Sequence, residues 1–581
     1  MCGLVGYIGN RQAARIVIEG LKKLEYRGYD SFGLATLNEG LSVAKKSGRI
    51  SGADPSFTSL PGTIGIGHTR WATHGVPDDR NAHPHLDCTG RIAVVHNGII
   101  ENYAELKREL LARGHIFRSD TDTEVVAHLV EEQFDGDLRS AFFAILPRLK
   151  GSYALLVAAE GCDTIVGARN GSPLVIGIGD REFFCSSDIT PLLEYTRRVI
   201  YLEDGDCIAL LRSELQIFHD GNPVSRQAEE VDWDVEDAKK GGFTHFMLKE
   251  IFEQPQVFYN TLQAVREADE ALAILSKRKE TISVIACGSS YHAGLLYKYI
   301  LESYCGIPVR VEIGSEFKYY TPPLTDLIIG LTQSGETADT LAALKMAKSC
   351  GCPTIAITNV VGSSVARIAD ATIYTRAGPE VSVAATKSFI AQLAAGLEIA
   401  SSLSENLSEW DLDRVNVMIE DALTIPVDGA VSLCKCANSI FFIGRGLYYP
   451  VALEGALKMK EITYIHAEGY AAGELKHGPF ALLSPDTPVI AVAMPGRTYP
   501  VMLSNIKEIK ARGAPVIGIG LTGDDELPEL VDLFLPVPAQ DEVAAVASVS
   551  VLLQRLAYQT ADALGCDIDK PRNLAKSVTV E

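Results

Sequence analysis

The sequence contains no apolar run close to the roughly 18 residues that a membrane-spanning helix requires. Residues 1–6 include neither a basic segment nor a long hydrophobic one, so they lack the pattern of a secretory signal peptide. These two absences predict a protein that does not enter a membrane and that stays in the cytoplasm.

Basic residues are scarce relative to acidic ones, with 53 Lys and Arg against 74 Asp and Glu, for a formal charge of −21. Nucleic acids and anionic membranes attract clustered positive charge, so this balance argues against both as partners. Small phosphates remain candidate ligands, because the backbone N–H groups at a helix N-terminus bind them whatever the net charge of the chain.

Cysteines are too sparse for a disulfide framework, with 12 in 581 residues. The two closest pairs, Cys350 with Cys352 and Cys434 with Cys436, do not have the CxxC spacing of a zinc knuckle. The histidines also lack metal-binding spacing on one helix. We therefore interpret the cysteines mainly as reduced structural thiols, with metal or redox chemistry as the minor alternative, and expect no metal ion and no cofactor.

The first part of the chain has a mixed α and β pattern. Apolar alternation at residues 92–96 and 153–157 predicts strands, and residues 102–113 and 122–133 have helical patterns, the second opening on a Thr-Asp-Thr-Glu capping sequence. An acidic, weakly periodic stretch at 229–237, followed by Lys-Lys-Gly-Gly, marks a domain boundary.

The remainder of the chain repeats one α/β pattern. A strand at 282–286 runs into a Gly-Ser-Ser loop and a helix, and the same order recurs from a strand at 439–443. In each copy a further buried strand follows, at 327–331 and at 489–493. This alternation predicts two doubly wound α/β units, in which ligands bind at the carboxyl ends of the parallel strands.

Cys2 is a candidate nucleophile. If Met1 is removed, Cys2 carries both a thiol and an α-amino group, which titrates near 7.7–8.0 and can serve as the base. Taken alone, Cys2 could be an incidental second residue. Later segments complete a site, however: Arg70 suits an α-carboxylate, Asp122 suits an α-ammonium group, and Asn97 with the N–H of Gly98 could form an oxyanion hole. These groups fit glutamine as the substrate.

These segments resemble the N-terminal-nucleophile (class II) glutamine amidotransferases, in five ordered matches at residues 2–6, 26–31, 68–75, 81–85 and 96–98. The resemblance implies an α+β four-layer αββα sandwich, with Cys2 as nucleophile and Asn97 and Gly98 as the oxyanion hole. The glutamine contacts that it implies, together with the neighbouring candidates, are Arg70, Trp71, Thr73, His74, His83 and Asp122. For Trp71, His74 and His83 the alternative is a packing role.

A second candidate site lies in the repeated part. Thr332, Ser334 and Thr337 follow a buried strand and could donate to phosphate oxygens, although Ser and Thr are also common helix caps. Glu454, Lys458 and Glu461 fall on one helical face, as an exposed ion-paired face would too. The tail after Lys576 is nearly uncharged, which indicates a docked segment rather than a frayed one.

This part resembles sugar-isomerase (SIS) domains, present twice, and the whole chain resembles the amidotransferase family that makes glucosamine 6-phosphate from fructose 6-phosphate and glutamine. The resemblance implies that Lys576 forms a Schiff base with the ketose, Glu461 moves the proton between C2 and C1, His477 assists ring opening and Lys458 takes part in imine chemistry. The residues implied to bind the sugar phosphate are Ser290, Thr332, Gln333, Ser334, Thr337, Val383 and Glu454.

The same resemblance implies a domain order and an assembly. The glutaminase domain covers residues 1–238, a linker 239–246, the two SIS domains 247–420 and 421–570, and a tail 571–581. Because His477 comes from the neighbouring subunit in this family, a homodimer is expected. Ammonia is expected to pass between the sites through a dry channel at the tail and Trp71.

Two positions depart from the usual family pattern. Thr332 stands where Ser is common and keeps the hydroxyl, whereas Ala385 stands where Ser is common and loses it. The long insertion of feedback-regulated forms is missing, so we expect no inhibition by nucleotide sugars. The rival functions are a sugar-phosphate isomerase or deaminase fused to an idle glutaminase, and a non-catalytic sugar-phosphate sensor. The first is disfavoured by the intact set Cys2, Arg70, Asn97, Gly98 and Asp122. The second is disfavoured by the joint presence of Glu461, His477 and Lys576.

Overall fold

The computed structural model describes residues 2–71, 75–231, 240–277, 281–319, 327–404, 411–538 and 542–577, apart from the side chain of Tyr26. The chain divides into two compact units, the first made mainly of residues 1–238 and the second of residues 239–576. None of the described helices combines the length and the apolar character that crossing a bilayer would require.

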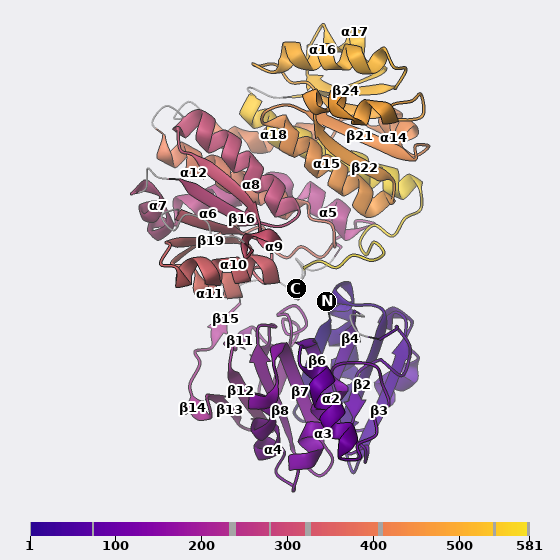
Figure 1. Ribbon diagram of the computed structural model, residues 1–581, viewed down its shortest axis with the longest axis vertical. Helices are drawn as coiled ribbons and strands as arrows, with labels where there is room; N and C mark the ends of the chain where they lie inside the picture. Colours follow the sequence, from indigo (N-terminus) through magenta and orange to yellow (C-terminus); the bar gives the residue numbers. More distant parts are fainter. Residues whose placement is uncertain are drawn as a thin grey trace. The chain divides into compact units, whose positions relative to one another are not determined.

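Two antiparallel sheets form the centre of the first unit (Figure 1). Within the described residues, one sheet has eight strands, in the order β15 (Glu229–Glu230), β11 (Arg198–Tyr201), β9 (Val175–Ile178), β10 (Phe183–Ser186), β1 (Gly3–Ile8), β4 (Ile64–Arg70), β2 (Ser31–Leu37) and β3 (Leu41–Ser47). The other has seven, in the order β14 (Asn222–Val224), β13 (Leu215–His219), β12 (Asp206–Leu211), β8 (Thr164–Asn170), β7 (Gly151–Ala159), β6 (Ile92–Ile100) and β5 (His85–Leu86).

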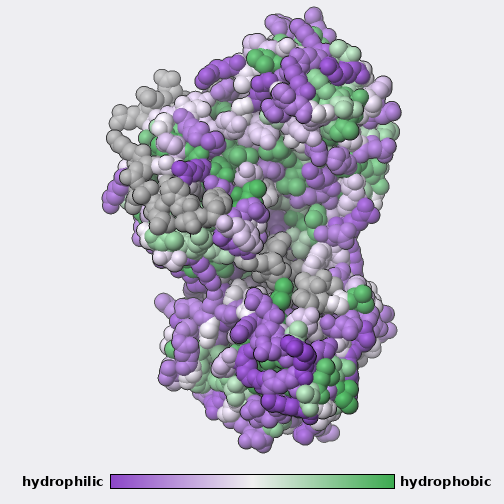
Figure 2. Space-filling view, viewed as in Figure 1, coloured by the Kyte–Doolittle hydropathy of each residue, from purple (hydrophilic) through white to green (hydrophobic). Residues whose placement is uncertain are grey.

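Three apolar clusters hold this unit together in layers. One cluster joins the facing sides of the two sheets, for example Leu4 with Val95 and Leu156. A second packs α1 (Ala13–Lys23) on the eight-stranded sheet, and a third packs α2 (Tyr103–Ala112), α3 (Glu124–Gln133) and α4 (Leu138–Ile145) on the seven-stranded sheet. The outer side of α2 and α3 is strongly hydrophilic (Figure 2). The result is the expected four-layer αββα sandwich.

Among the residues that the structure describes, each half of the second unit contains a parallel five-stranded sheet (Figure 1). The first sheet has the order β17 (Val309–Ile313), β16 (Ile282–Ala286), β18 (Leu327–Leu331), β19 (Thr354–Thr358) and β20 (Ala371–Tyr374). The second has the order β22 (His466–Ala471), β21 (Ser439–Gly444), β23 (Val489–Val492), β24 (Val516–Leu521) and β25 (Leu533–Val537). Both therefore follow the same doubly wound 2-1-3-4-5 order, which confirms the predicted repeat.

Helices cover both faces of each sheet. On the inner faces lie α5 (Phe246–Phe252), α6 (Gln254–Arg266), α7 (Asp269–Ser276), α8 (Ser289–Ile300), α12 (Lys387–Leu403), α13 (Val415–Ala422), α14 (Asp428–Cys434), α15 (Tyr448–Thr463) and α18 (Glu542–Ala563). On the outer faces lie α9 (Gly314–Phe317), α10 (Ala338–Ser349) and α11 (Ser364–Ile368) in the first half, and α16 (Tyr499–Lys510) and α17 (Leu527–Leu530) in the second.

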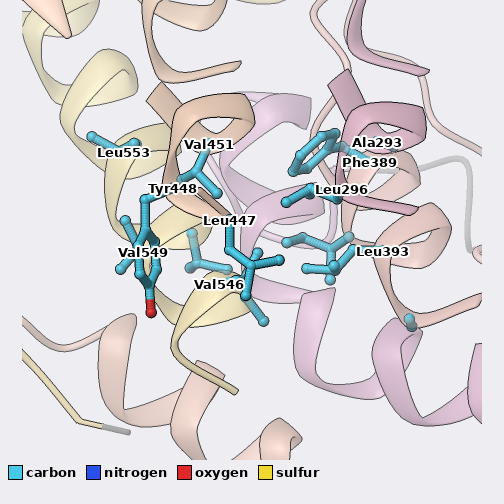
Figure 3. Close-up of a cluster of buried hydrophobic side chains, with 14 of the residues drawn as sticks. Ala293, Leu296, Phe389, Leu393, Leu447, Tyr448, Val451, Val546, Val549 and Leu553 are labelled. Atoms are coloured by element: carbon cyan, nitrogen blue, oxygen red, sulfur yellow. The ribbon is translucent and has the colours of Figure 1, made fainter. Parts of the chain in front are cut away.

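One continuous apolar core joins the two halves of the second unit. Phe389 and Leu393 of α12 lie with Leu296 of α8, and Tyr448 of α15 packs beside Val549 of α18 (Figure 3). Because the two sheets share this core, residues from both repeats are held in fixed positions relative to each other, and a site can draw on both.

Candidate active sites

Cys2 directly precedes β1, a strand between β10 and β4 in the eight-stranded sheet. The pairing of Gly3 with Thr69 brings Cys2 to the end of β4, where the N–H of Trp71 donates to the Cys2 Sγ at 3.3 Å. Burial raises the pKa of the Cys2 thiol. The thiol is therefore protonated at neutral pH and needs a base to become a nucleophile.

Asn97 and Gly98 approach Cys2 from the other sheet. They lie in β6, and the Asn97 Nδ2 donates to the Cys2 carbonyl oxygen at 3.0 Å. Gly98 has φ of +129°, and a Cβ there would lie 2.0 Å from the Ser152 carbonyl oxygen. This position therefore requires glycine, and it leaves a donor N–H and an amide within the same small region as the thiol.

Arg70 and Asp122 supply opposite charges near Cys2. Arg70 ends β4, is buried, and donates through Nη2 to the Gly75 carbonyl oxygen at 3.2 Å. Asp122 is buried before α3, and its Oδ2 accepts from the N–H of Ile100 at 2.7 Å. Burial has the largest effect on the pKa of Cys2. The charge of Arg70 lowers this pKa by a smaller amount, and the charge of Asp122 raises it. A cation and an anion thus both lie close enough to Cys2 for their charges to act on its thiol.

The helix predicted at 122–133 begins two residues later than expected, at Glu124. The capping sequence is not used as predicted, because the side chain of the N-cap residue Thr123 makes no capping hydrogen bond. Asp122 instead bonds to β6, and the Glu124 carboxylate accepts from the N–H groups of Arg118 and Ser119. The helix start is therefore decided by contacts with the preceding loop and the sheet.

For the remaining predicted glutamine contacts, the structure shows packing contacts or gives no description. His83 is buried, stacks on His68 at 4.1 Å between ring centroids, and accepts from the N–H of His96 through Nδ1. These contacts support the packing alternative for His83. Trp71 is half-buried and meets the Tyr29 ring edge-on at 5.6 Å. Thr73 and His74 lie outside the described residues.

In the second unit, α15 carries Glu454, Lys458 and Glu461 on one face, as predicted. The Lys458 ammonium pairs with Glu461 and lies 3.5 Å from the Glu454 carboxylate. The Lys458 and Glu454 side chains are only 1% and 2% exposed, which excludes the alternative of an ion-paired surface face. Burial lowers the pKa of Lys458, but the two carboxylates outweigh it and raise the pKa overall.

The first repeat contributes to the same cluster through α8. Ser289 Oγ donates to Glu454 Oε1 at 2.8 Å and accepts from Lys458 Nζ at 3.2 Å. His292 Nδ1 contacts the other Glu454 oxygen at 2.8 Å. His292 was not among the sequence candidates, because nothing in the local pattern indicates that one turn of α8 faces α15.

Glu380 is a further residue that sequence reasoning missed. Its carboxylate pairs with the Lys576 ammonium and accepts from the N–H groups of Thr386 and Ser388 at 2.9 and 3.0 Å. Burial opposes ionisation of Glu380, but the charge of Lys576 and these donors hold its pKa at about 2. The charge of Glu380 also raises the pKa of Lys458. Lys576 therefore lies in the same charged cluster as α15.

The loop at residues 332–337 follows β18, beside the loop that follows β16. Thr332 and Thr337 hydroxyl oxygens lie 3.1 Å apart, and Thr337 makes no side-chain capping bond to α10 although it occupies the N-cap. Helix capping therefore does not explain the role of the Thr337 hydroxyl. In the first turn of α8, which follows the neighbouring loop, Ser290 Oγ accepts from Gln392 Nε2 at 3.0 Å.

The other sugar-site candidates occupy varied positions. Gln333 and Ser334 are half-buried in the β18 loop, and Ser334 Oγ accepts from the N–H of Glu336 at 3.1 Å. Val383 is buried, and its N–H donates to the Asp569 carbonyl oxygen at 3.0 Å, which ties its loop to the C-terminal segment. His477 ends a short 3-10 helix, is exposed, and has no hydrogen bond to the charged cluster within the part of the chain that the structure describes.

Glu250, on α5, is a buried acid next to Glu380. One of its oxygens accepts from the N–H groups of Val381 and Ser382, and burial followed by the Glu380 charge raises its pKa to about 8. Its usual pKa is 4.5, so between about pH 4.5 and 8 the unfolded chain has released this proton while the folded chain retains it. This group therefore costs stability as the pH rises through that window.

We expect Glu250→Gln to raise the melting temperature relative to the unsubstituted protein, by an amount that increases from pH 5 to pH 8. The variant keeps an acceptor for Val381 and Ser382 and has no proton to lose. Thermal unfolding across this pH range measures the difference, with the exposed Glu529→Gln as control. A difference that is constant with pH would contradict the argument.

The expectation of no metal ion depended on the spacing of ligand residues along single helices. The fold, however, brings ligand residues from different segments together. Cys88, His115, His128 and Glu131 come from three segments of the first unit, yet one ligand atom from each lies within 4.8 Å of all the others. Of these four residues only His128 and Glu131 share a helix, so local spacing could not reveal the cluster.

Comparison with known proteins agrees with the division of the chain into two units. A glutamine amidotransferase domain matches residues 68–194, and an SIS domain matches residues 274–401 and 433–561. The chain is 49% identical to a glutamine–fructose-6-phosphate aminotransferase (isomerizing) of Pyrococcus horikoshii and 47% identical to one of Methanosarcina acetivorans, each alignment covering 100% of both chains.

Among solved structures, the second unit is similar to the C-terminal domain of glucosamine-fructose-6-phosphate aminotransferase from Francisella tularensis. The identity is 37%, the TM-score is 0.53, and the match covers 57% of this chain and 99% of that one.

Proposed function

Because this chain belongs to the family of glutamine–fructose-6-phosphate aminotransferases (isomerizing), we propose that its two units divide that reaction between the residues described above. The enzyme converts D-fructose 6-phosphate and L-glutamine into D-glucosamine 6-phosphate and L-glutamate, the first step of hexosamine synthesis. The observation that carries the assignment of roles is two neighbouring ion pairs, Lys576 with Glu380 and Lys458 with Glu461, with the Glu380 charge also acting on Lys458.

In the first unit, Cys2 attacks the side-chain amide of glutamine. Removal of Met1 would free an α-amino group two carbons from the sulfur, and this amine would take the thiol proton that burial otherwise retains. Asn97 and the N–H of Gly98 would stabilise the oxyanion of the tetrahedral intermediate. Arg70 and Asp122 would hold the α-carboxylate and α-ammonium groups, with Thr73 and His74 as further candidates.

In the second unit, Lys576 would form the imine with C2 of the ketose, and the carboxylate of Glu461 would carry the proton between C1 and C2. Lys458, held cationic by Glu454 and Glu461, would stabilise negative charge that develops on the substrate. Glu380 would position Lys576 before the substrate binds. The loop at residues 332–337 and the start of α8, which carries Ser290, would hold the phosphate, with Val383 as a further candidate contact.

Ammonia must stay unprotonated between the two reactions, so we propose that it does not pass through solvent. Trp71 and residues 571–581 are the candidates for this path from the sequence. The proposed domain boundaries are 1–238, 239–246, 247–420, 421–570 and 571–581, and we propose that the enzyme works in the cytoplasm. We also propose a homodimer, because His477 is exposed and lies outside the hydrogen-bonded cluster that it should serve.

Co-expression of two inactive variants tests the shared site. If His477 acts on the neighbouring subunit, a mixed dimer of Glu461→Gln and His477→Asn chains has one site in which both residues are intact. Random pairing makes half of the dimers mixed, so the co-expressed protein should recover about a quarter of the unsubstituted activity, far above either variant alone.

The measurement is glucosamine 6-phosphate and glutamate formed together from fructose 6-phosphate and glutamine, by mass spectrometry. The control is a mixture of the two variants purified separately and not allowed to exchange subunits, which should stay inactive. If the co-expressed sample is as inactive as the separately purified mixture, His477 acts within its own chain or not at all. If the unsubstituted enzyme forms glutamate but no glucosamine 6-phosphate, fructose 6-phosphate is not its ammonia acceptor.

A further inference from the structure

The first unit contains a cluster of four metal-ligand side chains that the amidotransferase reaction does not use. Cys88 lies in the turn between β5 and β6, His115 follows α2, and His128 and Glu131 lie one turn apart on α3. We propose that these four residues bind one zinc ion as a closed structural site. The site belongs to the first unit alone and is independent of the roles assigned to Cys2 and Asp122.

The sulfur–nitrogen distances within the cluster match tetrahedral coordination, and the nitrogen–oxygen distances are about 0.3 Å shorter than it requires. With a zinc–sulfur bond of about 2.3 Å and zinc–nitrogen and zinc–oxygen bonds of about 2.0–2.1 Å, neighbouring ligand atoms should lie about 3.5 Å (S to N) and about 3.3 Å (N to O) apart. Cys88 Sγ is 3.5 Å from the Nδ1 atoms of both His115 and His128. Both Nδ1 atoms are 3.0 Å from Glu131 Oε2. A mixed thiolate, imidazole and carboxylate set of four favours zinc.

The outer nitrogen of each imidazole provides an independent argument. The Nε2 of His115 lies 3.4 Å from the Glu132 carboxylate, and the Nε2 of His128 lies 3.7 Å from the Glu124 carboxylate. Ligating histidines commonly direct their other ring N–H to a carboxylate, which fixes the tautomer and increases the basicity of the ligand. Each outer nitrogen therefore has a carboxylate nearby, with the 3.7 Å separation at His128 longer than a hydrogen bond.

The thiol also has the environment of a ligand. The N–H of Ile116 donates to Cys88 Sγ at 3.4 Å, and the half-buried cysteine leaves one edge of the cluster near the surface, where the released proton can leave. The ion would tie the β5–β6 turn and the segment after α2 to α3. Asp122 and Thr123 immediately precede α3, so the same ion would hold in place the helix that follows the proposed glutamine contact.

Metal analysis of the untagged, full-length protein tests the proposal. We expect about one zinc per chain by inductively coupled plasma mass spectrometry. Cobalt exchanged for zinc should give the intense visible bands of tetrahedral coordination and a thiolate charge-transfer band. Cys88→Ser should remove the charge-transfer band and most of the bound metal, and His128→Gln should lower metal retention as well. Glu132→Gln should weaken metal binding by roughly 10- to 100-fold through His115.

Cys162→Ser is the matched control, because Cys162 is also a half-buried cysteine of the first unit but is not a member of the four-residue cluster. This variant should keep both the zinc and the cobalt spectrum. If the unsubstituted protein binds less than about a tenth of an equivalent and gives no cobalt bands, the proposal is wrong. Metal that is retained equally by Cys88→Ser and Cys162→Ser would show adventitious binding elsewhere and would also overturn it.

Discussion

Replacing Cys2 with alanine is expected to lower glutamine-dependent formation of glucosamine 6-phosphate by at least about 10³-fold, because no other group can form the thioester with glutamine. The Asn97 and Gly98 donors do not supply a nucleophile, so they cannot compensate. Proton exchange on the sugar should continue, since Glu461 and Lys576 belong to the second unit. The two activities should therefore separate completely in this variant.

Two assays on the same preparation make this separation visible. One measures glutamate and glucosamine 6-phosphate by mass spectrometry, and the other measures deuterium incorporated from heavy water into fructose 6-phosphate at C1. Cys162→Ala serves as the control for replacing a half-buried thiol of the first unit and should retain both activities. If Cys2→Ala still releases glutamate at a comparable rate, Cys2 is not the nucleophile.

Replacing Glu461 with glutamine should have the opposite effect to Cys2→Ala, with sugar chemistry lost and glutamine hydrolysis retained. The amide oxygen can still accept from Lys458, so the charged cluster keeps its hydrogen bond, but the amide cannot accept and return a proton. Deuterium exchange and amino-sugar formation should each fall by about 10²- to 10⁴-fold, the usual contribution of a positioned general base. Hydrolysis of glutamine to glutamate should persist.

The control for this variant is Glu529→Gln, which makes the same chemical change at an exposed position of α17. Equal melting temperatures of the two variants would show that the loss is chemical, not a failure to fold. Retention of full deuterium exchange in Glu461→Gln would mean that another carboxylate moves the proton. Glu454 is the nearest alternative on the same face of α15, at 3.5 Å from Lys458 Nζ.

Local patterns predicted the regular elements well. The strands at 282–286 and 327–331 have the predicted bounds, because a short β-branched run bounded by polar loops is a strong local signal. The helix at 122–133 was less well predicted. It begins at Glu124, because Asp122 bonds to the distant strand β6 and Glu124 bonds to the loop just before the helix. Local capping preferences cannot anticipate such partners.

Residue types at short spacings indicated the candidate reactive groups, the two-fold repeat of the α/β half and the family resemblance. Three features came from folding alone: the burial of the Lys458 face, the pairing of Glu380 with Lys576 and the meeting of Cys88 with His115 and His128. Residues 380 and 576 are far apart along the chain, and no local pattern encodes that meeting. Packing decides which groups lose water and which charges become neighbours, and those two effects decide the chemistry.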